Sequence, residues 1–338
     1  MTTDSHSGRT GEQPGVFPRH LLDAESLTLA QLETILTLAA RFKKERAAVR
    51  EVQQSSQSVP PPPQRNLLAG RTVVTLFFEA STRTRSSFET AARALGAGVI
   101  ALQKEGTSLS KGETLADTAK NLEAVGVDAL ILRHPFAGTP HQVAREVKVS
   151  VVNAGDGQHE HPTQALLDAL TLREALGDLK GRTVAIVGDI AHSRVARSNI
   201  HTLGKLGAKV RVAGPRTLLP IGIEKLGCDV MHSLDAALDG VDAVMALRIQ
   251  QERISDARLP STRDYSRLWG IQQRHVDRLP AHAVVLHPGP VNRGVELASD
   301  VLDGPRSRVM EQVDSGVAVR MAVLALCLRA ITPAEVAA

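Results

Sequence analysis

The chain has 338 residues, which exceeds the usual size of one domain and is long enough to bury two hydrophobic cores. Hydrophobic residues make up 43% of the chain and charged residues 22%, a balance that is ordinary for a globular protein and excludes an intrinsically disordered one. The formal charge is +4, but with 2% aromatic residues and no dense basic run we expect small anionic substrates and no nucleic acid as partner.

Membrane association is not expected either. No apolar run reaches the roughly 18 to 20 residues of a membrane span, and the start MTTDSHSGRT lacks the apolar core of a signal peptide. We therefore expect a cytoplasmic location and no membrane partner. Cys228 and Cys327 lie in no pairing motif, so we expect both to be buried thiols.

The first part of the chain contains one predicted helix between two polar segments. Residues 1–16 are predicted to form a disordered leader. The spacing of Leu29, Leu32 and the apolar residues after them predicts a helix over 27–49. Residues 51–66 are polar and then polyproline, which favours an exposed spacer loop over a docking site for a proline-binding partner.

From residue 71 short apolar runs alternate with helical patterns, which is typical of parallel sheets. Two such series predict an α/β protein with two doubly wound parallel-sheet domains, joined near a helix at 163–176. A last helix with a continuous apolar face is predicted at about 310–329. The predicted strands are TVVTLFF, GVIALQ, DALILRHP and VSVVNAG in the first series, and TVAIVGD, KVRVAGP, DAVMALRIQ and AVVLHPGP in the second.

Residues 77–96 link the first predicted strand to a helix whose natural N-cap is Ser81. The first turn of this helix carries arginines, although the positive end of a helix dipole favours anions. Backbone N–H groups, the hydroxyls of Ser81, Thr82 and Thr84, and the guanidinium of Arg83 together suit a phosphate group. On this local pattern alone, an exposed, well-capped helix start with incidental arginines is equally consistent.

Polar residues follow the predicted strands at the positions where open parallel sheets bind ligands. A single cleft between the two sheets would gather them. A dinucleotide is disfavoured as the ligand, because VGDIAHSR has one glycine in place of G-x-G-x-x-G. These strand-end residues are Glu79, Arg133, His134, Asn153, Asp189, Arg248, Gln250, His287 and Pro288.

The segment 158–164, QHEHPTQ, places two histidines around a glutamate, as some metal sites do. However, Pro162 fits the first position of a helix and His161 the cap before it, so the histidines do not share a helix face as H-E-x-x-H ligands would. We therefore expect no metal ion here. For His159, the role of a satisfied cap remains open.

Several of these motifs resemble the transcarbamoylase family. Residues 81–85, STRTR, followed by SFE at 87–89, closely resemble its carbamoyl-phosphate signature, and HPTQ at 161–164 and SLSKGET at 108–114 match two further family motifs. The resemblance covers about residues 20–330, apart from the proline-rich loop. Ala80 and Gly289 depart from the usual residues, proline and leucine or alanine, but neither change removes a reacting group.

The second half of the chain indicates the acceptor amino acid. HPGPVNR at 287–293 and RIQ at 248–250 are similar to the aspartate-type members, and the H-C-L-P and S-M-G motifs of ornithine-type members do not occur in the sequence. The second carboxylate of aspartate needs cationic partners such as Arg194 and Arg248, which would repel the ammonium group of ornithine. The resemblance thus implies transfer of the carbamoyl group of carbamoyl phosphate to L-aspartate in pyrimidine biosynthesis; transfer to another amino acid such as ornithine is the alternative.

The resemblance also implies a direct attack of the aspartate amine on the carbamoyl carbon, without metal or organic cofactor. Thr84, Arg133 and His161 would stabilise the oxyanion, while Arg83 and Lys111 hold the phosphate. The full set for carbamoyl phosphate is Ser81, Thr82, Arg83, Thr84, Ser108, Lys111, Arg133, His161, Gln164, Pro288 and Gly289, and the set for aspartate is Lys111, Arg194, Arg248 and Gln250.

Finally, the resemblance implies a division of the chain and an assembly. Residues 17–162 would form the carbamoyl-phosphate-binding domain, 163–309 the aspartate-binding domain, and the C-terminal helix, 310–332, would pack back on the first. A homotrimer is expected, in which the loop with Ser108 and Lys111 reaches the active site of the neighbouring subunit. A dihydroorotase or a regulatory chain would be the partner in a larger assembly, and a non-catalytic scaffold subunit of such an assembly is the alternative to an enzyme.

Overall fold

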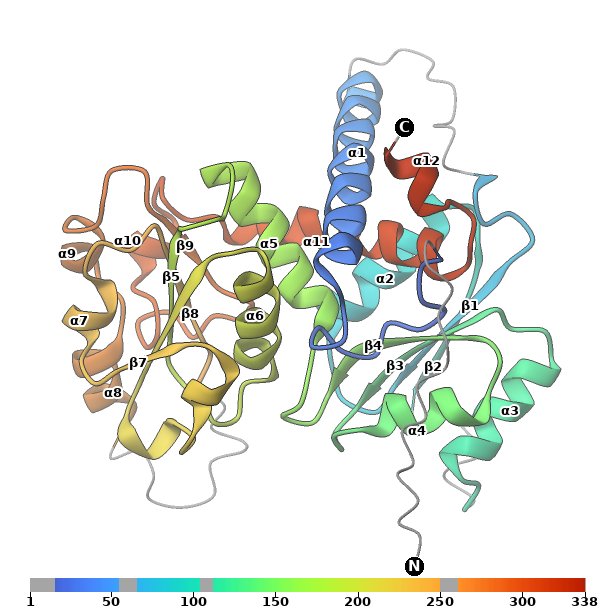
Figure 1. The fold of residues 1–338 in the computed structure, drawn as a ribbon, viewed down its shortest axis with the longest axis horizontal. Coiled ribbons are helices and arrows are strands. Elements are labelled where there is room, and N and C mark those ends of the chain that lie inside the picture. The colour runs from blue at the N-terminus through green and yellow to red at the C-terminus, as the bar shows by residue number, and fades with distance from the viewer. Residues whose placement is uncertain (1–15, 55–65, 104–111, 250–260, 338) are drawn as a thin grey trace, which may run out of the picture.

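The computed structural model describes residues 16–54, 66–103, 112–249 and 261–337, which form an α/β fold with two parallel sheets (Figure 1). The first sheet has the strand order β2-β1-β3-β4, and every neighbouring pair is parallel. Its strands are β1 (Thr72–Phe77), β2 (Gly98–Gln103), β3 (Ala129–His134) and β4 (Ser150–Asp156).

The second sheet has the order β7-β6-β5-β8-β9 and is also parallel throughout. The predicted fold class is therefore confirmed, and each of the eight predicted strands is present. The edge strand β7 was not predicted, because it has only three residues, of which Asp229 is exposed and the other two are half-buried, and these give no apolar run. The strands are β5 (Thr183–Val187), β6 (Lys209–Ala213), β7 (Asp229–Met231), β8 (Ala243–Ala246) and β9 (Val284–Leu286).

Both faces of each sheet are covered by helices, as parallel sheets require. Alternate residues of β1 therefore enter different cores: Val73 and Phe77 belong to the core shared with α1 and α2, and Val74 and Leu76 to the core under α3 and α4. The helices around the sheets are α2 (Thr82–Ala94), α3 (Leu115–Ala124), α4 (Thr139–Glu146), α6 (Arg194–Lys205), α7 (Leu234–Leu238), α8 (Thr262–Trp269), α9 (Gln273–Val276), α10 (Ser299–Leu302) and α12 (Pro333–Ala337).

Two helices join the halves into one structure. α5 (Pro162–Leu176) and α11 (Val309–Cys327) lie between the sheets, and α11 packs against α1, α2 and α5 (Figure 1). A single cluster of buried residues contains Val73 of β1, Ile186 of β5 and Val319 of α11. The hydrophobic core is consequently continuous from one sheet to the other.

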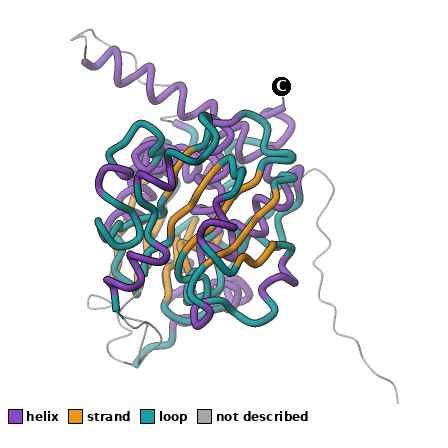
Figure 2. Tube along the Cα trace, turned by 90° about the vertical axis from the view of Figure 1, so that its left-hand side faces the viewer, coloured by secondary structure: helices purple, strands orange, loops and turns teal. Residues whose placement is uncertain are grey.

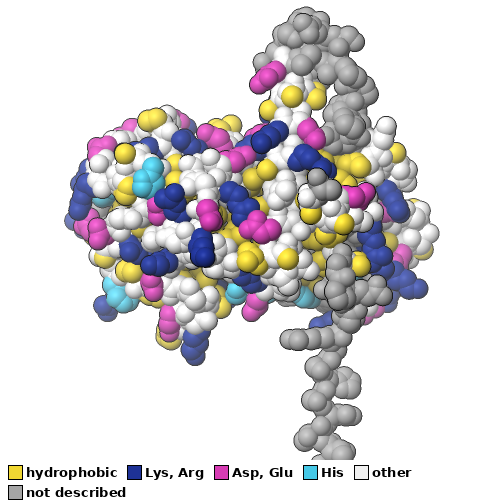
Figure 3. All heavy atoms as spheres, turned by 45° about the horizontal axis from the view of Figure 1, so that its top comes forward, with side chains coloured by type: hydrophobic (Ala, Val, Ile, Leu, Met, Phe, Trp, Pro, Cys, Tyr) yellow, Lys and Arg dark blue, Asp and Glu magenta, His cyan; other side chains and the backbone are white. Residues whose placement is uncertain are grey.

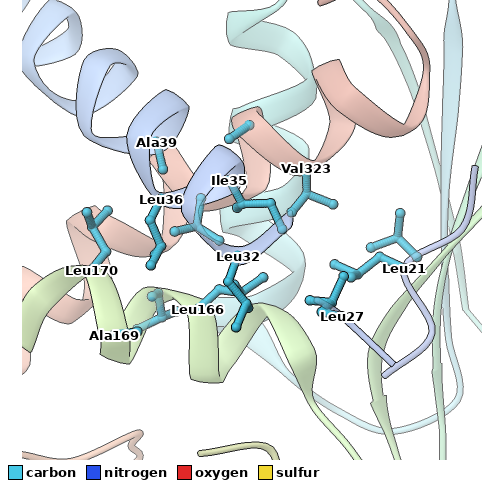
Figure 4. Packing of buried hydrophobic residues seen from close by; sticks show 14 of the residues in the cluster. Leu21, Leu27, Leu32, Ile35, Leu36, Ala39, Leu166, Ala169, Leu170 and Val323 are labelled. Carbon is cyan, nitrogen blue, oxygen red and sulfur yellow. The ribbon is translucent and has the colours of Figure 1, made fainter. Parts of the chain in front are cut away.

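Helix α1 (Leu29–Gln54) contributes an apolar face to this core. Leu32 and Leu36 are one turn apart and point toward Leu166 and Leu170 of α5 (Figure 4). Burying each such side chain stabilises the fold by about 1.5–3 kcal/mol. Farther along, Lys43 pairs with Glu174 at 2.5 Å and ties α1 to α5 through charge as well.

Helix α1 extends beyond its predicted end, and its outer end projects from the body of the protein (Figure 2). Residues 51–54 had been assigned to the proline-rich loop, which was wrong for these four. Their sequence, EVQQ, contains no helix breaker, and the first proline after the helix is Pro60. Residues 55–65 of the predicted loop and 1–15 of the predicted leader lie outside the described residues.

The surface and the cysteines agree with the composition. Basic and acidic side chains are intermixed on the face seen in Figure 3, without a continuous basic track. Within the described ranges, no helix has the length and apolar character needed to cross a membrane. Cys228 and Cys327 are free and buried, as predicted.

Candidate active site

A pocket of about 740 Å³ lies at the carboxyl ends of the strands and is lined by residues from both halves of the chain. Ser108, Lys111 and Gln250 lie outside the described residues, so the structure does not place them. The other residues predicted to bind substrate all line the pocket: Ser81, Thr82, Arg83, Thr84, Arg133, His161, Gln164, Arg194, Arg248, Pro288 and Gly289. The expectation that one cleft gathers every strand-end residue was wrong for His134, Asn153 and Asp189, which do not line the pocket because their side chains bond to nearby residues of their own loops.

The N-terminus of α2 opens into this pocket. Ser81 is the N-cap, with extended backbone (φ −162°), but its hydroxyl makes no capping hydrogen bond and is left for the pocket. The first turn has no acidic residue, so its N–H groups and dipole face the cavity uncompensated by a carboxylate of this turn. Arg85, by contrast, turns to Glu89 at 3.7 Å and does not line the pocket.

Arg83 lies against the loop that follows β9. A Cβ atom added to Gly289 would overlap the guanidinium of Arg83, and Gly289 has a positive φ of 63°. The glycine that departs from the family pattern therefore leaves the space that this arginine occupies. A larger residue here would require Arg83 to move.

Arg133 and Arg194 meet around one carboxylate. Nη2 of Arg194 is 2.7 Å from Oε2 of Glu79, and Nε of Arg133 is 3.5 Å from the same oxygen. A Cβ on Gly155 would come within 2.9 Å of Arg194 and 3.2 Å of Arg133, so the glycine lets the two guanidinium groups approach each other. In this structure Arg194, predicted to meet a substrate carboxylate, already meets that of Glu79.

His161 caps α5, with Pro162 at the first helical position as predicted. Its backbone N–H donates to Oγ of Ser198 at 2.8 Å, and within the described part of the chain its Nδ1 has no hydrogen-bond partner. Burial and then the charges of neighbouring arginines, Arg133 first, lower the pKa of His161 well below its ordinary value. The imidazole is therefore neutral at pH 7 and keeps one N–H to donate into the pocket.

The loop after β9 is held by hydrogen bonds from both sides. The backbone N–H of His287 donates to Oε1 of Gln312 at 2.9 Å, and that of Gly289 donates to Nδ1 of His287 at 2.7 Å. Since Nδ1 accepts, the ring proton of neutral His287 is on Nε2, which lies 3.2 Å from Glu296. Burial lowers the pKa of His287, which agrees with a neutral ring.

Sequence reasoning missed the two polar pocket residues on α11, Gln312 and Arg320. Arg320 is 3% exposed, donates to Oγ of Ser87 at 2.5 Å and lies over the ring of Phe88, and burial lowers its pKa to about 9. The available signal was a charged residue in the middle of the apolar run SGVAVRMAVLALC, where charge is rarely buried without a function.

The positions of the described side chains do not support a metal site in the segment 158–164. Nδ1 of His159 lies 3.1 Å from Oδ2 of Asp156, and the ring centre of His159 is 5.7 Å from that of His141. Among the residues that the structure describes, no group of three or more histidine, cysteine, aspartate or glutamate side chains is placed to hold a metal ion.

The charge of the pocket defines what it can bind. Its described lining carries five arginines, at 83, 133, 194, 248 and 320, and a single carboxylate, Glu79. Such a surplus of guanidinium groups suits more than one anionic group at a time, and guanidinium binds phosphates and carboxylates through paired N–H donors. The neutral donor His161 and the amide of Gln164 lie in the same cavity.

Comparison with known families assigns both halves of the chain. Residues 19–174 match the family Aspartate/ornithine carbamoyltransferase, carbamoyl-P binding domain, and residues 180–327 match Aspartate/ornithine carbamoyltransferase, Asp/Orn binding domain. The aspartate carbamoyltransferase catalytic subunit of Myxococcus xanthus is 60% identical over 262 residues, 78% of this chain and 88% of the relative. That of Acidothermus cellulolyticus is 54% identical over 94% of both chains.

A solved structure supports the same assignment. The structure of aspartate transcarbamoylase from Trypanosoma cruzi in complex with carbamoyl phosphate superposes with a TM-score of 0.78 at 30% identity, covering 90% of this chain and 94% of that one.

Proposed function

The chain belongs to the aspartate/ornithine carbamoyltransferase family, and we propose that the pocket between its two sheets is the active site in which it works. The protein is an enzyme that transfers the carbamoyl group of carbamoyl phosphate to aspartate, a reaction of pyrimidine biosynthesis. The products are N-carbamoyl-L-aspartate and phosphate. The observation that carries the site assignment is the meeting of the α2 N-terminus with five arginines around one cavity.

The phosphate group is proposed to bind at the start of α2. Ser81, Thr82 and Arg83 supply hydroxyl and guanidinium donors there, and the helix dipole adds to them. Pro288 and Gly289 also line the pocket, and Gly289 lies against the guanidinium of Arg83. Lys111, with Ser108, is proposed to complete this subsite from a neighbouring subunit.

The carbamoyl group is proposed to lie between Thr84, Arg133 and His161, whose donors would stabilise the oxyanion of the tetrahedral intermediate. The amine of aspartate forms the new C–N bond to the carbamoyl carbon, and the bond from that carbon to the phosphate oxygen then breaks. The departing phosphate takes the amine proton, so no side chain has to act as a nucleophile. Positioning and electrostatic preorganisation therefore carry the catalysis, without a cofactor.

The two carboxylates of aspartate are proposed to bind Arg194 and Arg248, with Gln250 and Lys111 beside them. Support comes from the positive surplus of the pocket, which would repel the side-chain ammonium of ornithine. Arg194 would exchange Glu79 for a substrate carboxylate, or share its donors between the two.

The domain division and the assembly belong to the same proposal. Residues 17–162 would bind carbamoyl phosphate and 163–309 aspartate, with the C-terminal helix, 310–332, completing the first; the contacts of α11 with α1 and α2 support this division. A homotrimer with shared sites accounts for the role given to Lys111, and a dihydroorotase or a regulatory chain would be its partner in a larger complex. The two free, buried cysteines fit the reducing environment of the cytoplasm.

The test is an assay of the isolated chain for N-carbamoyl-L-aspartate, with L-ornithine as the competing acceptor and with and without a metal chelator. We expect product from aspartate, none from ornithine, and no effect of the chelator. Turnover of ornithine would overturn the assignment of the acceptor. An inactive chain that still binds carbamoyl phosphate and assembles with a partner would favour the scaffold subunit instead.

A further inference from the structure

Asp168 is a buried carboxylate directly beneath the pocket. It lies on α5 four residues after Gln164, a spacing that places both side chains on one face of the helix, and it is 0% exposed. Nε2 of Gln164 donates to Oδ1 of Asp168 at 2.9 Å. A carboxylate so deeply buried requires donors around it, and the described residues supply three.

All three donors are side-chain amides, and they come from three different helices. Besides Gln164 of α5, Gln312 of α11 donates from Nε2 to Oδ1 at 2.7 Å, and Asn199 of α6 donates from Nδ2 to Oδ2 at 2.8 Å. An ionised carboxylate can only accept hydrogen bonds, so each amide must turn its NH₂ end toward Asp168. Gln312 confirms the rule at its other end, where Oε1 accepts from the backbone of His287.

For Gln164 this orientation determines what the pocket meets. Its NH₂ end is engaged by Asp168, and its carbonyl oxygen is the end left for the cavity that the side chain lines. No hydrogen bond to Oε1 of Gln164 comes from any residue that the structure describes. The pocket therefore offers an acceptor at this point, although a glutamine in isolation offers either end equally well.

We propose that Asp168 is a specificity-determining positioning residue: by orienting the Gln164 amide, it makes the enzyme select an acyl phosphate that carries an NH₂ group over one that carries a methyl group. This selectivity rests on the proposed function, in which the carbamoyl amide meets Gln164. The carbamoyl NH₂ donates to Oε1 of Gln164, whereas the methyl group of acetyl phosphate has no proton to donate. Asp168 acts entirely through Gln164 and touches no substrate.

The charge on Asp168 supports this role above pH 7. Burial raises its pKa to about 6, while the three amides and the charge of Arg320 act in the opposite direction. Measurements at pH 8 therefore examine the ionised form of Asp168, which can accept hydrogen bonds but cannot donate them.

The experiment measures the dissociation constants of carbamoyl phosphate and acetyl phosphate by calorimetry at pH 8 and compares their ratio between variants. In wild type we expect carbamoyl phosphate to bind more tightly. Asp168→Ala removes the acceptor, so Gln164 can turn either end to the pocket, and we expect the ratio to fall by about 3- to 10-fold, the loss of one hydrogen bond. A purely structural role would weaken both ligands equally and leave the ratio unchanged.

Two controls separate the positioning role from general damage. Asp168→Asn keeps an acceptor at Oδ1 if Asn199 turns its amide, so we expect it to retain most of the wild-type ratio. In a Gln164→Met background, Asp168→Ala should not change the ratio further, because the group through which Asp168 acts is gone. Asp168→Ser, whose shorter side chain withdraws the acceptor but leaves a polar group, should behave as the alanine variant and serves if that one does not fold.

The possible failures are distinguishable. A wild type that carbamoylates aspartate but binds both phosphates equally would overturn the selectivity and leave the proposed function intact. An equal ratio in wild type, Asp168→Ala and Asp168→Ser would overturn the positioning role. A change in ratio that persists in the Gln164→Met background would show that Asp168 acts by another route. Absence of carbamoyl transfer in wild type would instead count against the proposed function.

Discussion

Arg194 and Glu79, which both line the pocket, form an ion pair between the two halves of the protein, with Nη2 of the arginine 2.7 Å from Oε2 of the glutamate. Glu79 follows β1 of the first sheet, and Arg194 begins α6 in the second half. Glu79 is also the single carboxylate among the described residues that line the pocket, so it offsets part of the charge that anions would meet.

We predict that Glu79→Gln strengthens the binding of inorganic phosphate while it weakens turnover. Removing one negative charge from the pocket is worth on the order of 1 kcal/mol once screening by solvent and salt is included, or roughly a 5-fold lower dissociation constant. Turnover falls because Arg133 and Arg194 lose the group that orients them. Calorimetry with phosphate checks this, with Glu89→Gln on α2, which does not line the pocket, as the matched control; equal affinity in both variants would be the contrary result.

Arg248→Ala should impair the use of aspartate much more than the binding of carbamoyl phosphate. The residue follows β8 and lines the part of the pocket assigned to aspartate. Loss of a charge-assisted hydrogen bond to a carboxylate costs about 1.5–3 kcal/mol, which corresponds to an increase in the aspartate KM of roughly 10- to 100-fold. Steady-state kinetics in both substrates decide the matter, and equal losses for the two would show that Arg248 belongs to another subsite.

Arg83→Ala should abolish most turnover, by about 10²- to 10³-fold, without unfolding the protein. Arg83 sits at the positive end of α2, so its removal relieves an unfavourable charge on the helix. Phosphate should raise the melting temperature of wild type and raise that of the variant less. Arg85→Ala is the matched control, because Arg85 is two residues away but faces Glu89. The same protection of Arg83→Ala as of wild type would place the anion elsewhere.

Mixed trimers should test whether each site is shared. Arg83→Ala and Lys111→Ala proteins are each expected to be nearly inactive. After their subunits are dissociated, mixed and reassembled, a ring with both chain types has one interface where an intact Arg83 meets an intact Lys111, so about one site in three should recover. A mixture that stays inactive despite demonstrated exchange of subunits would mean that each chain builds its site alone.

Glu160 gives the fold a pH dependence that a single substitution removes. It is 2% exposed, and burial raises its pKa to about 7, against the opposing hydrogen bond from Ser198. The folded state therefore keeps the proton that the unfolded state has lost between about pH 4.5 and 7, so the contribution of Glu160 to stability declines as the pH rises through this range. Glu160→Gln should show a gain in stability over wild type at pH 8, on the order of 3 kcal/mol, that largely disappears at pH 4.5. Urea unfolding at the two pH values measures it, and a gain independent of pH would contradict the assignment.

Strand positions and the helix starts at Ser81 and His161 were predictable because each depends on local pattern: an apolar run, a capping residue, a proline at the first helical position. The predicted loop was wrong at 51–54, because the polar composition of these residues does not prevent helix formation and α1 continues to Gln54.

The partners of the polar residues in and beside the pocket could not be found in this way. Asp168, Gln312 and Arg320 act through contacts between α5, α6 and α11, which are far apart in the sequence. Their side chains look out of place in apolar helices, and only the three-dimensional packing shows that they satisfy one another. The roles of Ser108, Lys111 and Gln250 stay predictions, because the structure does not describe these residues.

The position of α11 also constrains how the molecule is made. This helix covers α1 and α2, yet it is formed by residues 309–327, almost three hundred residues after α1 begins. During synthesis on a ribosome the apolar faces of α1 and α2 stay uncovered until the second half has emerged. The first half of the chain therefore cannot complete its hydrophobic core until α11 has been synthesised.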